Sequence, residues 1–147
     1  MPLRRIVGAA SVVVTAAAAT AGLGAQPAGA SVWNGVYTDA QAARGQDVYL
    51  RECTNCHGAS LAGADVTPAL TGGAFGSNWN GLTAGDLFER IRTTMPADRP
   101  GALTRQQNAD VIAFVLKANG WPAGTAELAR DVAALKQIAI VTIKPER

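Results

Sequence analysis

The sequence is poor in the side chains that most often bind metals. Cysteine occurs only as Cys53 and Cys56, histidine only as His57, and methionine only as Met1 and Met95. A structural zinc site normally takes four Cys or His ligands, often as two pairs, and this chain offers only half of such a set. The composition therefore disfavours a structural zinc site.

Long, strongly apolar runs are also missing. The most hydrophobic stretch, from Ile6 to about Ala21, is diluted with Ala, Thr, Ser and Gly, whereas a membrane-spanning helix needs about 20 mainly apolar residues. Two arginines precede this stretch and the A-x-A pattern Ala28-Gly29-Ala30 follows it, an arrangement typical of a secretory signal peptide. We expect residues 1–30 to be a signal peptide cleaved after Ala30 and the protein to be periplasmic or otherwise exported. A retained membrane anchor is the alternative.

The remaining chain has no excess of one charge. Two of the thirteen basic residues lie in the predicted signal peptide, which leaves eleven basic and eleven acidic residues. A chain without a basic excess gives no support for nucleic-acid binding. The roughly 117 residues that remain are enough for one small domain with a modest apolar core. We expect no stable membrane span in it.

Cys53, Cys56 and His57 form the pattern C-x-x-C-H, the attachment sequence of c-type haem. Two thiols three positions apart can each form a thioether to a haem vinyl group, while the adjacent imidazole binds the iron. The pattern therefore predicts one haem, covalent through Cys53 and Cys56, with His57 as iron ligand. A chance match to so short a pattern and a thioredoxin-like redox pair are the alternatives. The redox pair is disfavoured because the preceding residues predict a helix and not a β-strand.

Two capping patterns predict long helices. The T-D-A-Q that begins at Thr38 predicts a capping box and a helix to about Glu52. The T-x-x-Q that begins at Thr104 predicts another helix, which ends at Asn119-Gly120. Gly45 costs about 1 kcal/mol in a helix interior relative to Ala. Its presence favours a close approach between the two helices.

The other segments are shorter or irregular. A short helix is predicted from Thr83 to just before Thr93, and residues 58–81, rich in Gly, Ala and Asn, predict a loop. Residues 127–136 predict a short surface helix, and residues 138–143 predict an extended segment. This extended tail is expected to pack over its own domain, with a partner-docking surface as the alternative. The fold class is predicted to be all-α.

The order of helix, C-x-x-C-H, loop, short helix, Met-Pro and terminal helix resembles the class I cytochromes c, the small bacterial single-haem kind. The resemblance covers residues 38–120, after a lead-in at 31–37 and before a tail at 121–147. It implies three to four helices around one covalently attached haem. It also implies that a glycine and an aromatic of the first helix pack across the terminal helix: Gly45 and Tyr49 against Val111 and Phe114.

The resemblance also implies the haem surroundings. Pro68 and Leu70 match the family's P-x-L element, in which the proline carbonyl accepts the Nδ1 proton of the ligating histidine and the leucine packs on the haem. A metal-bound histidine almost always gives its other N–H to an acceptor. Met95 is the remaining thioether for the sixth iron position, in a loop that Pro96 biases toward extended geometry, and the family's ligand is likewise a methionine in such a loop. A core-packing methionine and an open sixth position are the alternatives.

Haem propionates need donors when they are buried. Trp79, Arg92 and Arg99 lie near the Met95 loop in the sequence and are the candidates. Each has an ordinary alternative, because Trp79 can be a core residue and the two arginines can be solvated surface residues.

His/Met ligation leaves no open iron position for a substrate, and a thioether ligand favours the ferrous state. The resemblance therefore implies a one-electron carrier that works with redox protein partners and is not an enzyme. The W-N-G-V-Y lead-in and the Gly-rich middle resemble, more weakly, the cytochromes associated with periplasmic quinoprotein alcohol dehydrogenases. They imply that the chain accepts electrons from a periplasmic dehydrogenase, either as a separate carrier or as its cytochrome subunit. It would pass them to a terminal oxidase or other acceptor. A haem sensor or weak peroxidase with a labile sixth ligand, and a non-haem thiol oxidoreductase, are the alternatives.

Overall fold

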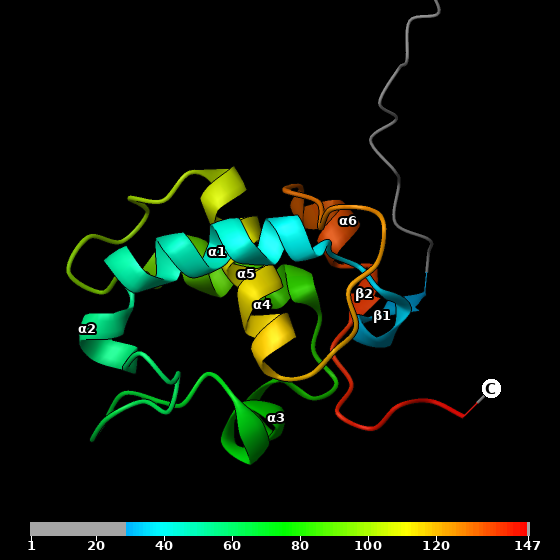
Figure 1. The fold of residues 1–147 in the computed structure, drawn as a ribbon, viewed down its shortest axis with the longest axis horizontal. Helices are drawn as coiled ribbons and strands as arrows, with labels where there is room; N and C mark the ends of the chain where they lie inside the picture. Colours follow the sequence, from blue (N-terminus) through cyan, green and yellow to red (C-terminus); the bar gives the residue numbers. More distant parts are fainter. Residues whose placement is uncertain (1–28, 147) are drawn as a thin grey trace, which may run out of the picture.

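The structure, a computed structural model, describes residues 29–146, so most of the predicted signal peptide lies outside the described residues. The described chain is mainly helical (Figure 1), which confirms the all-α prediction. Its elements are β1 Ala30–Ser31, the 3₁₀ helix η1 Val32–Asn34, α1 Asp39–Glu52, α2 Thr54–His57, α3 Gly72–Trp79, α4 Ala84–Thr94, α5 Arg105–Ala118, α6 Val132–Leu135 and β2 Ile138–Ala139. Among residues 29–146, no helix has the length and apolarity needed to cross a membrane.

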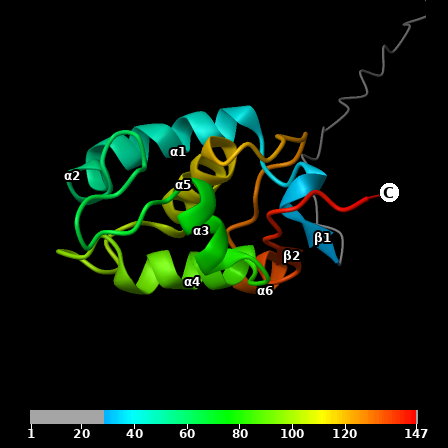
Figure 2. The ribbon, with the colours of Figure 1, turned by 90° about the horizontal axis from the view of Figure 1, so that it is seen from below.

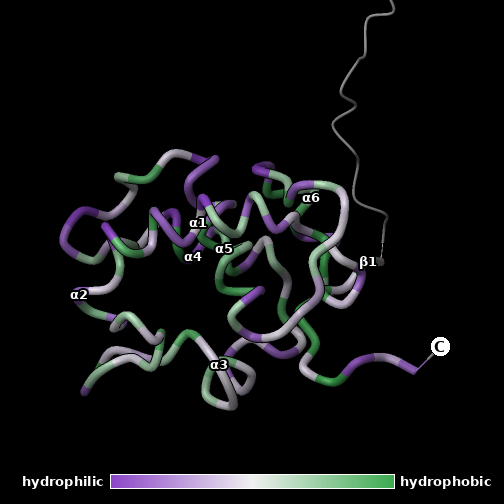
Figure 3. The backbone as a smooth tube through the Cα atoms, in the orientation of Figure 1, coloured by the Kyte–Doolittle hydropathy of each residue, from purple (hydrophilic) through white to green (hydrophobic). Residues whose placement is uncertain are grey.

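Helix α5 lies between α1 and α4 and forms the centre of the domain (Figure 2). Most of its residues are buried, and its hydrophobic stretch runs through the middle of the molecule (Figure 3). Gly45 of α1 faces α5 so closely that a Cβ atom there would collide with the Asp110 carbonyl and lie 3.0 Å from the Phe114 Cβ. The ring centroids of Tyr49 and Phe114 lie 5.3 Å apart. The close approach predicted from Gly45 is therefore present, with Asp110 and Phe114 as its nearest neighbours on α5.

The two predicted capping boxes have different outcomes. At Thr104 the box is complete, with both the Thr104 hydroxyl and the Gln107 side chain capping backbone amides. At Thr38 the hydroxyl accepts a hydrogen bond from the Gln41 amide at 3.1 Å, but the return bond is absent. The Gln41 carboxamide instead bonds both backbone groups of Leu128, at 2.6 and 3.0 Å. Gln41 is fully buried, and its side chain hydrogen-bonds the tail instead of capping its own helix.

The prediction that residues 58–81 form only a loop is wrong, because α3 lies within them. Its buried Phe75 stacks on Trp79 with ring centroids 6.1 Å apart and contacts Trp121 edge-on at 6.3 Å. A Cβ at Gly76 would lie 2.8 Å from the Thr142 side chain. Aromatic packing and the close approach of the tail therefore hold a helix whose glycine content disfavours one.

Helix α4 also continues further than predicted. It begins with the capping box of Thr83 and Asp86 and extends through Thr94, past the predicted end before Thr93. The hydroxyls of Thr93 and Thr94 donate to the carbonyls of Glu89 and Arg90, at 2.7 and 2.6 Å. These bonds satisfy both hydroxyls within the helix.

The tail packs over its own domain, and Leu128, Leu135, Ile138 and Ile140 are buried there. The helix predicted at residues 127–136 is limited to α6, because the Asp131 side chain caps it by accepting from the Ala134 amide at 3.1 Å. Strand β2 pairs in parallel with β1, Ala30 with Ile138 and Ser31 with Ala139. The β1 strand was not predicted, since its partner lies more than a hundred residues away.

Candidate functional site

The C-x-x-C-H residues lie at the junction of two helices. Cys53 is both the C-cap of α1 and the N-cap of α2, and His57 is the last residue of α2. The backbone amide of His57 donates to the Cys53 carbonyl at 3.0 Å, which completes one helical turn. Residues three apart on a helix share a face, so this turn places both cysteines on one side. His57 is buried, Cys53 is half-buried and Cys56 is exposed.

The two thiols do not form a disulfide. Burial raises the pKa of Cys53 to about 11, and the negative charges of Glu52 and Cys56 add to this effect. A thiol of this kind stays protonated at neutral pH, whereas redox-active cysteines have a lowered pKa that favours the thiolate. The surroundings of Cys53 therefore do not favour a thiol oxidoreductase.

The imidazole of His57 is oriented by a backbone carbonyl. Its Nδ1 lies 3.0 Å from the Pro68 carbonyl oxygen, the contact that the P-x-L resemblance implies. A carbonyl oxygen can only accept, so Nδ1 carries the proton and Nε2 keeps a lone pair. This tautomer leaves Nε2 available for a metal.

Gly63 holds the Pro68 segment in place. Its amide donates to the His57 carbonyl at 2.9 Å, and its φ angle is +72°. A Cβ at this position would lie 2.8 Å from both the Pro68 carbonyl carbon and the Ala69 nitrogen. A glycine is therefore required where the chain passes between His57 and Pro68. Sequence reasoning missed this role, although Gly63 lies within five residues of Pro68.

Tyr49 joins α1 to the end of α2. Its hydroxyl donates to the Gly58 carbonyl at 2.6 Å, directly after the histidine. Burial raises the pKa of Tyr49 to about 12, with a smaller contribution from the charge of Cys53. The sequence predicts Tyr49 only as a packing residue, and the hydrogen bond of its hydroxyl was not predicted.

Leu70 is half-buried against the core, and its backbone ties the loop to α5. Its amide donates to the Leu61 carbonyl at 2.8 Å, and its carbonyl accepts from the Asn119 side chain at 2.9 Å. Leu61 is itself buried and has a positive φ of 60°. The segment that carries Pro68 is therefore fixed at both ends.

Met95 ends α4 in extended geometry, with φ −123° and ψ 151°, as Pro96 predicts. The peptide bond between them is cis. The Met95 side chain is half-buried, and its amide donates to the Ile91 carbonyl at 2.9 Å. Its role as iron ligand stays a prediction.

The three candidates for holding propionates differ in their surroundings. Trp79 stacks on Phe75 as part of the core surface. Arg99 is 55% exposed and forms a 2.6 Å ion pair with Glu52. The Nε of Arg92 is buried and has no hydrogen-bond acceptor among residues 29–146. A buried N–H of a cation without an acceptor fits a missing anionic group.

These donors fit a c-type haem. The chain presents two cysteine thiols one turn apart, an imidazole whose Nε2 can bind a metal, and a buried guanidinium N–H that has no acceptor within the described residues. The thiols match the vinyl groups, the imidazole matches the iron and the guanidinium matches a carboxylate.

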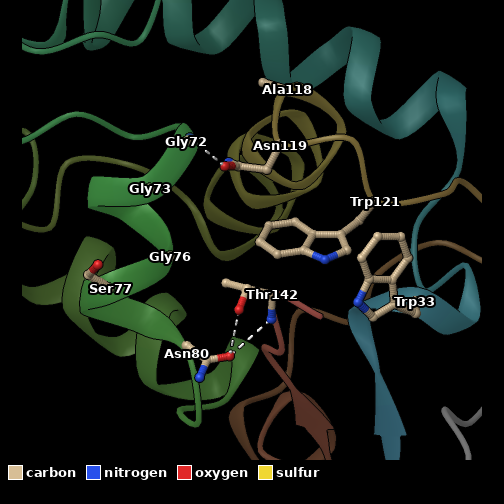
Figure 4. A pocket seen from close by; sticks show the side chains of 10 residues that line it. All are labelled: Trp33, Gly72, Gly73, Gly76, Ser77, Asn80, Ala118, Asn119, Trp121 and Thr142. Carbon is tan, nitrogen blue, oxygen red and sulfur yellow. Dashed lines mark hydrogen bonds between the residues drawn. The ribbon is translucent and has the colours of Figure 1, made fainter. Parts of the chain in front are cut away.

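A separate surface pocket of about 630 Å³ lies between α3 and the tail (Figure 4). The glycines Gly72, Gly73 and Gly76 line one side of it, and the indoles of Trp33 and Trp121 line the other. Both indole N–H groups donate to the Val141 carbonyl, at 3.0 and 3.2 Å. None of the predicted haem-binding residues lines this pocket.

Comparison with known proteins gives two matches. The family model described as "Cytochrome C oxidase, cbb3-type, subunit III" matches residues 40–115, more than half of the chain. The crystal structure of the sulfane dehydrogenase SoxCD from Paracoccus pantotrophus is similar, with a TM-score of 0.52 and 20% sequence identity. That alignment covers 73% of this chain and 61% of the SoxCD chain, and it supports the fold. A comparison with curated protein sequences gives no match.

Proposed function

Because this chain belongs to the "Cytochrome C oxidase, cbb3-type, subunit III" family of class I c-type cytochrome domains, we propose that it is an exported one-electron carrier with a single haem c. Haem-based electron transfer is the role that this domain implies. The observation that carries the proposal is the 3.0 Å contact between His57 Nδ1 and the Pro68 carbonyl, directly after the two cysteines.

Each residue has a distinct task in this proposal. Cys53 and Cys56 hold the haem by thioethers, and His57 offers Nε2 to its iron because Pro68 fixes the Nδ1 proton. Met95, from its extended position after α4, would offer its thioether as the second side-chain ligand of the iron. When bound, the haem would supply a reversible Fe(II)/Fe(III) couple. With His57 and Met95 both bound to the iron, the chain would leave no position there for a substrate.

The features that support export and partners are in the sequence. Residues 1–30 have the pattern of a signal peptide, and c-type haem is attached outside the cytoplasm. We place the protein in the periplasm, between a dehydrogenase that donates electrons and a terminal oxidase or other acceptor. The balanced charge provides no strong overall field for partner choice, so local surface contacts decide it.

The test is to express the full chain with haem-attachment machinery and to examine the purified protein after denaturation. We expect one haem to stay with the polypeptide and its spectrum to change reversibly on reduction and reoxidation. Removal of both thiols, Cys53→Ser with Cys56→Ser, should release the haem on denaturation, whereas Ser60→Ala, at an exposed position nearby, should not. Fractionation should place the protein in the periplasm, with a mature sequence that begins at Ser31.

A wild-type protein that carries no haem would contradict the proposal. Ready binding of carbon monoxide to the reduced protein would favour the sensor or peroxidase alternative, because it requires an open or labile iron position. Free, reversibly oxidised thiols in a colourless protein would favour a thiol oxidoreductase.

A further inference from the structure

Asparagine stands directly before glycine at three places in the chain: Asn34-Gly35, Asn80-Gly81 and Asn119-Gly120. Asparagine is among the thermolabile residues, and a following glycine, which has no Cβ, leaves its own amide nitrogen most accessible to the asparagine side chain. All three pairs are therefore candidates for deamidation by sequence. They differ in their hydrogen bonds, so the structure can rank them.

Deamidation at such a pair is an intramolecular acyl transfer. The glycine backbone nitrogen attacks the asparagine Cγ and forms a C–N bond, and its proton passes to a base in the solvent. The bond between Cγ and Nδ2 then breaks, and Nδ2 takes a proton from water and leaves as ammonia. Water opens the resulting succinimide at either carbonyl, which gives aspartate or isoaspartate. The reaction needs a free glycine N–H, an Nδ2 that can leave and donors to the oxyanion that forms at Oδ1.

The Asn34 pair meets all of these requirements. The Asn34 Oδ1 accepts from the Ser31 backbone N–H at 2.6 Å and from the Ser31 hydroxyl at 3.2 Å. Because a backbone N–H can only donate, this contact also fixes the orientation of the carboxamide. Asn34 is exposed, and neither its Nδ2 nor the Gly35 N–H has a hydrogen-bond partner among residues 29–146.

The Asn80 pair lacks a free nucleophile. The Asn80 Oδ1 has a similar pair of donors, the Thr142 backbone N–H at 2.9 Å and the Thr142 hydroxyl at 3.1 Å. The Gly81 N–H, however, donates to the Ile140 carbonyl at 2.9 Å. This bond must break before the nitrogen can attack, which slows the step about two- to tenfold.

The Asn119 pair is held at both reacting groups. The Gly120 N–H donates to the Lys117 carbonyl at 3.0 Å. The Asn119 Nδ2 donates to the carbonyls of Leu70 and Val115, at 2.9 and 2.8 Å. Both the nucleophile and the leaving group are therefore tied to backbone carbonyls, and this pair should react most slowly.

We propose that Asn34 is a site of spontaneous deamidation and that Ser31 promotes the reaction by stabilising the oxyanion at Oδ1. The inference goes beyond the electron carrier and does not depend on haem. After the proposed cleavage at Ala30, the Ser31 nitrogen would be an α-ammonium, which is a stronger donor than a peptide N–H. The isoaspartate product would add a backbone atom beside Gly35, where even a Cβ would lie 3.0 Å from the Gly124 Cα. It would therefore loosen the N-terminal lead-in from the domain.

The test is to incubate the purified, haem-loaded protein at neutral pH and to follow each pair by peptide mapping with mass spectrometry. The spectra detect replacement of the amide NH₂ by OH. We expect Asn34 to be lost first, Asn80 about two- to tenfold more slowly, and Asn119 slowest. The same protein unfolded in guanidinium chloride is the control, because without local structure the three pairs should react at similar rates.

Two variants test the part played by Ser31. Ser31→Ala removes the hydroxyl donor but keeps the backbone N–H, so it should slow the loss of Asn34 and leave that of Asn80 unchanged. Thr142→Ala removes the corresponding hydroxyl at Asn80 and should leave Asn34 unchanged. Faster loss of Asn34 in Ser31→Ala would overturn the role of Ser31, because it would mean that the hydroxyl only restrains the side chain.

Two outcomes in the wild-type protein would overturn the site itself. One is a folded protein in which Asn34 is lost no faster than Asn80 or Asn119. The other is the same order with the same ratios in the unfolded protein, which would assign the difference to neighbouring residues in the sequence and not to the structure. Both leave the haem content unaffected, so the proposed function would stand.

Discussion

The Nδ1 atom of His57 lies 3.0 Å from the carbonyl oxygen of Pro68, which belongs to a loop eleven residues further along the chain. The contact uses a backbone atom, so no side-chain substitution at Pro68 removes the acceptor itself. Gly63, which packs against the Pro68 carbonyl carbon at a distance that leaves no space for a Cβ, controls its position.

Substitution of Gly63 provides a test of this contact. Gly63→Ala should push the Pro68 carbonyl away from His57, lower the basicity of the imidazole and raise the midpoint potential. Gly72→Ala is the matched control, because Gly72 has nearly the same φ, +71° against +72°, and no atom within 4 Å of its Cβ position. Both variants should lose about 1 kcal/mol to backbone strain. Equal potentials in the two variants would mean that Gly63 does not position Pro68.

Met95→Ala should remove the proposed sixth ligand of the iron. We expect loss of the weak sulfur-to-iron band at the red end of the ferric spectrum, a lower midpoint potential and new binding of carbon monoxide to the reduced form. Val66→Ala, at a 98% exposed position, is the control for loss of an apolar side chain. An unchanged ferric spectrum in Met95→Ala would assign Met95 to packing alone.

Gly45→Ala should destabilise the contact between α1 and α5. The new methyl group would collide with the Asp110 carbonyl, and overpacking of this kind costs about 1–3 kcal/mol. Gly73→Ala, in helix α3 with open space around the new Cβ, should instead stabilise by about 0.5–1 kcal/mol. Urea unfolding of the two variants measures both effects. A Gly45→Ala protein as stable as wild type would show that α1 and α5 can move apart without loss of unfolding free energy.

Tyr49→Phe should weaken the link between α1 and the residue after His57. Loss of the bond to the Gly58 carbonyl is expected to cost about 1 kcal/mol at neutral pH. The raised pKa also predicts a pH effect: the folded protein holds the phenolic proton up to about pH 12, whereas the unfolded chain releases it near 10.0. Stability from this group is complete below the unfolded pKa and is lost as pH rises toward the folded one.

The measurement is the difference in unfolding free energy between wild type and Tyr49→Phe across this alkaline window. The pKa of Tyr37 is also raised by burial, but Tyr37 is present in both proteins, so its effect on stability cancels in the difference. The wild type should lose its advantage as the pH rises. A constant difference would mean that Tyr49 titrates normally. Thioether formation at Cys53 would remove its thiolate charge, and burial would then be the cause of the raised pKa of Tyr49.

Local sequence patterns predicted the long helices well, because their signals lie within a few residues. The Thr104 capping box, the close approach at Gly45 and the extended geometry before Pro96 all follow from short-range sterics and hydrogen bonding. Gln41 shows the limit of such patterns. Its side chain satisfies Leu128, 87 residues away, and no local pattern contains that partner.

The other features that the sequence failed to predict also depend on partners far away in the chain. Helix α3 depends on the packing of Phe75 against Trp121, and β1 depends on its pairing with β2. For the candidate site, the motif and the P-x-L resemblance led to His57 and Pro68, but not to Gly63 or the Tyr49 hydroxyl. The sequence did not distinguish Arg92 from Arg99 as a candidate propionate donor. The structure does, because Arg99 already pairs with Glu52 and the Nε of Arg92 is buried.

The pairing of β1 with β2 brings both ends of the described chain to one end of the molecule, opposite α2 (Figure 1). A tag or surface attachment made at either end would therefore leave the C-x-x-C-H end facing outward. A protein tethered to an electrode by residue 146 would present that end to a soluble partner. The same arrangement would permit a circular permutant, in which a short linker joins the two ends and new termini open in the loop between α5 and α6.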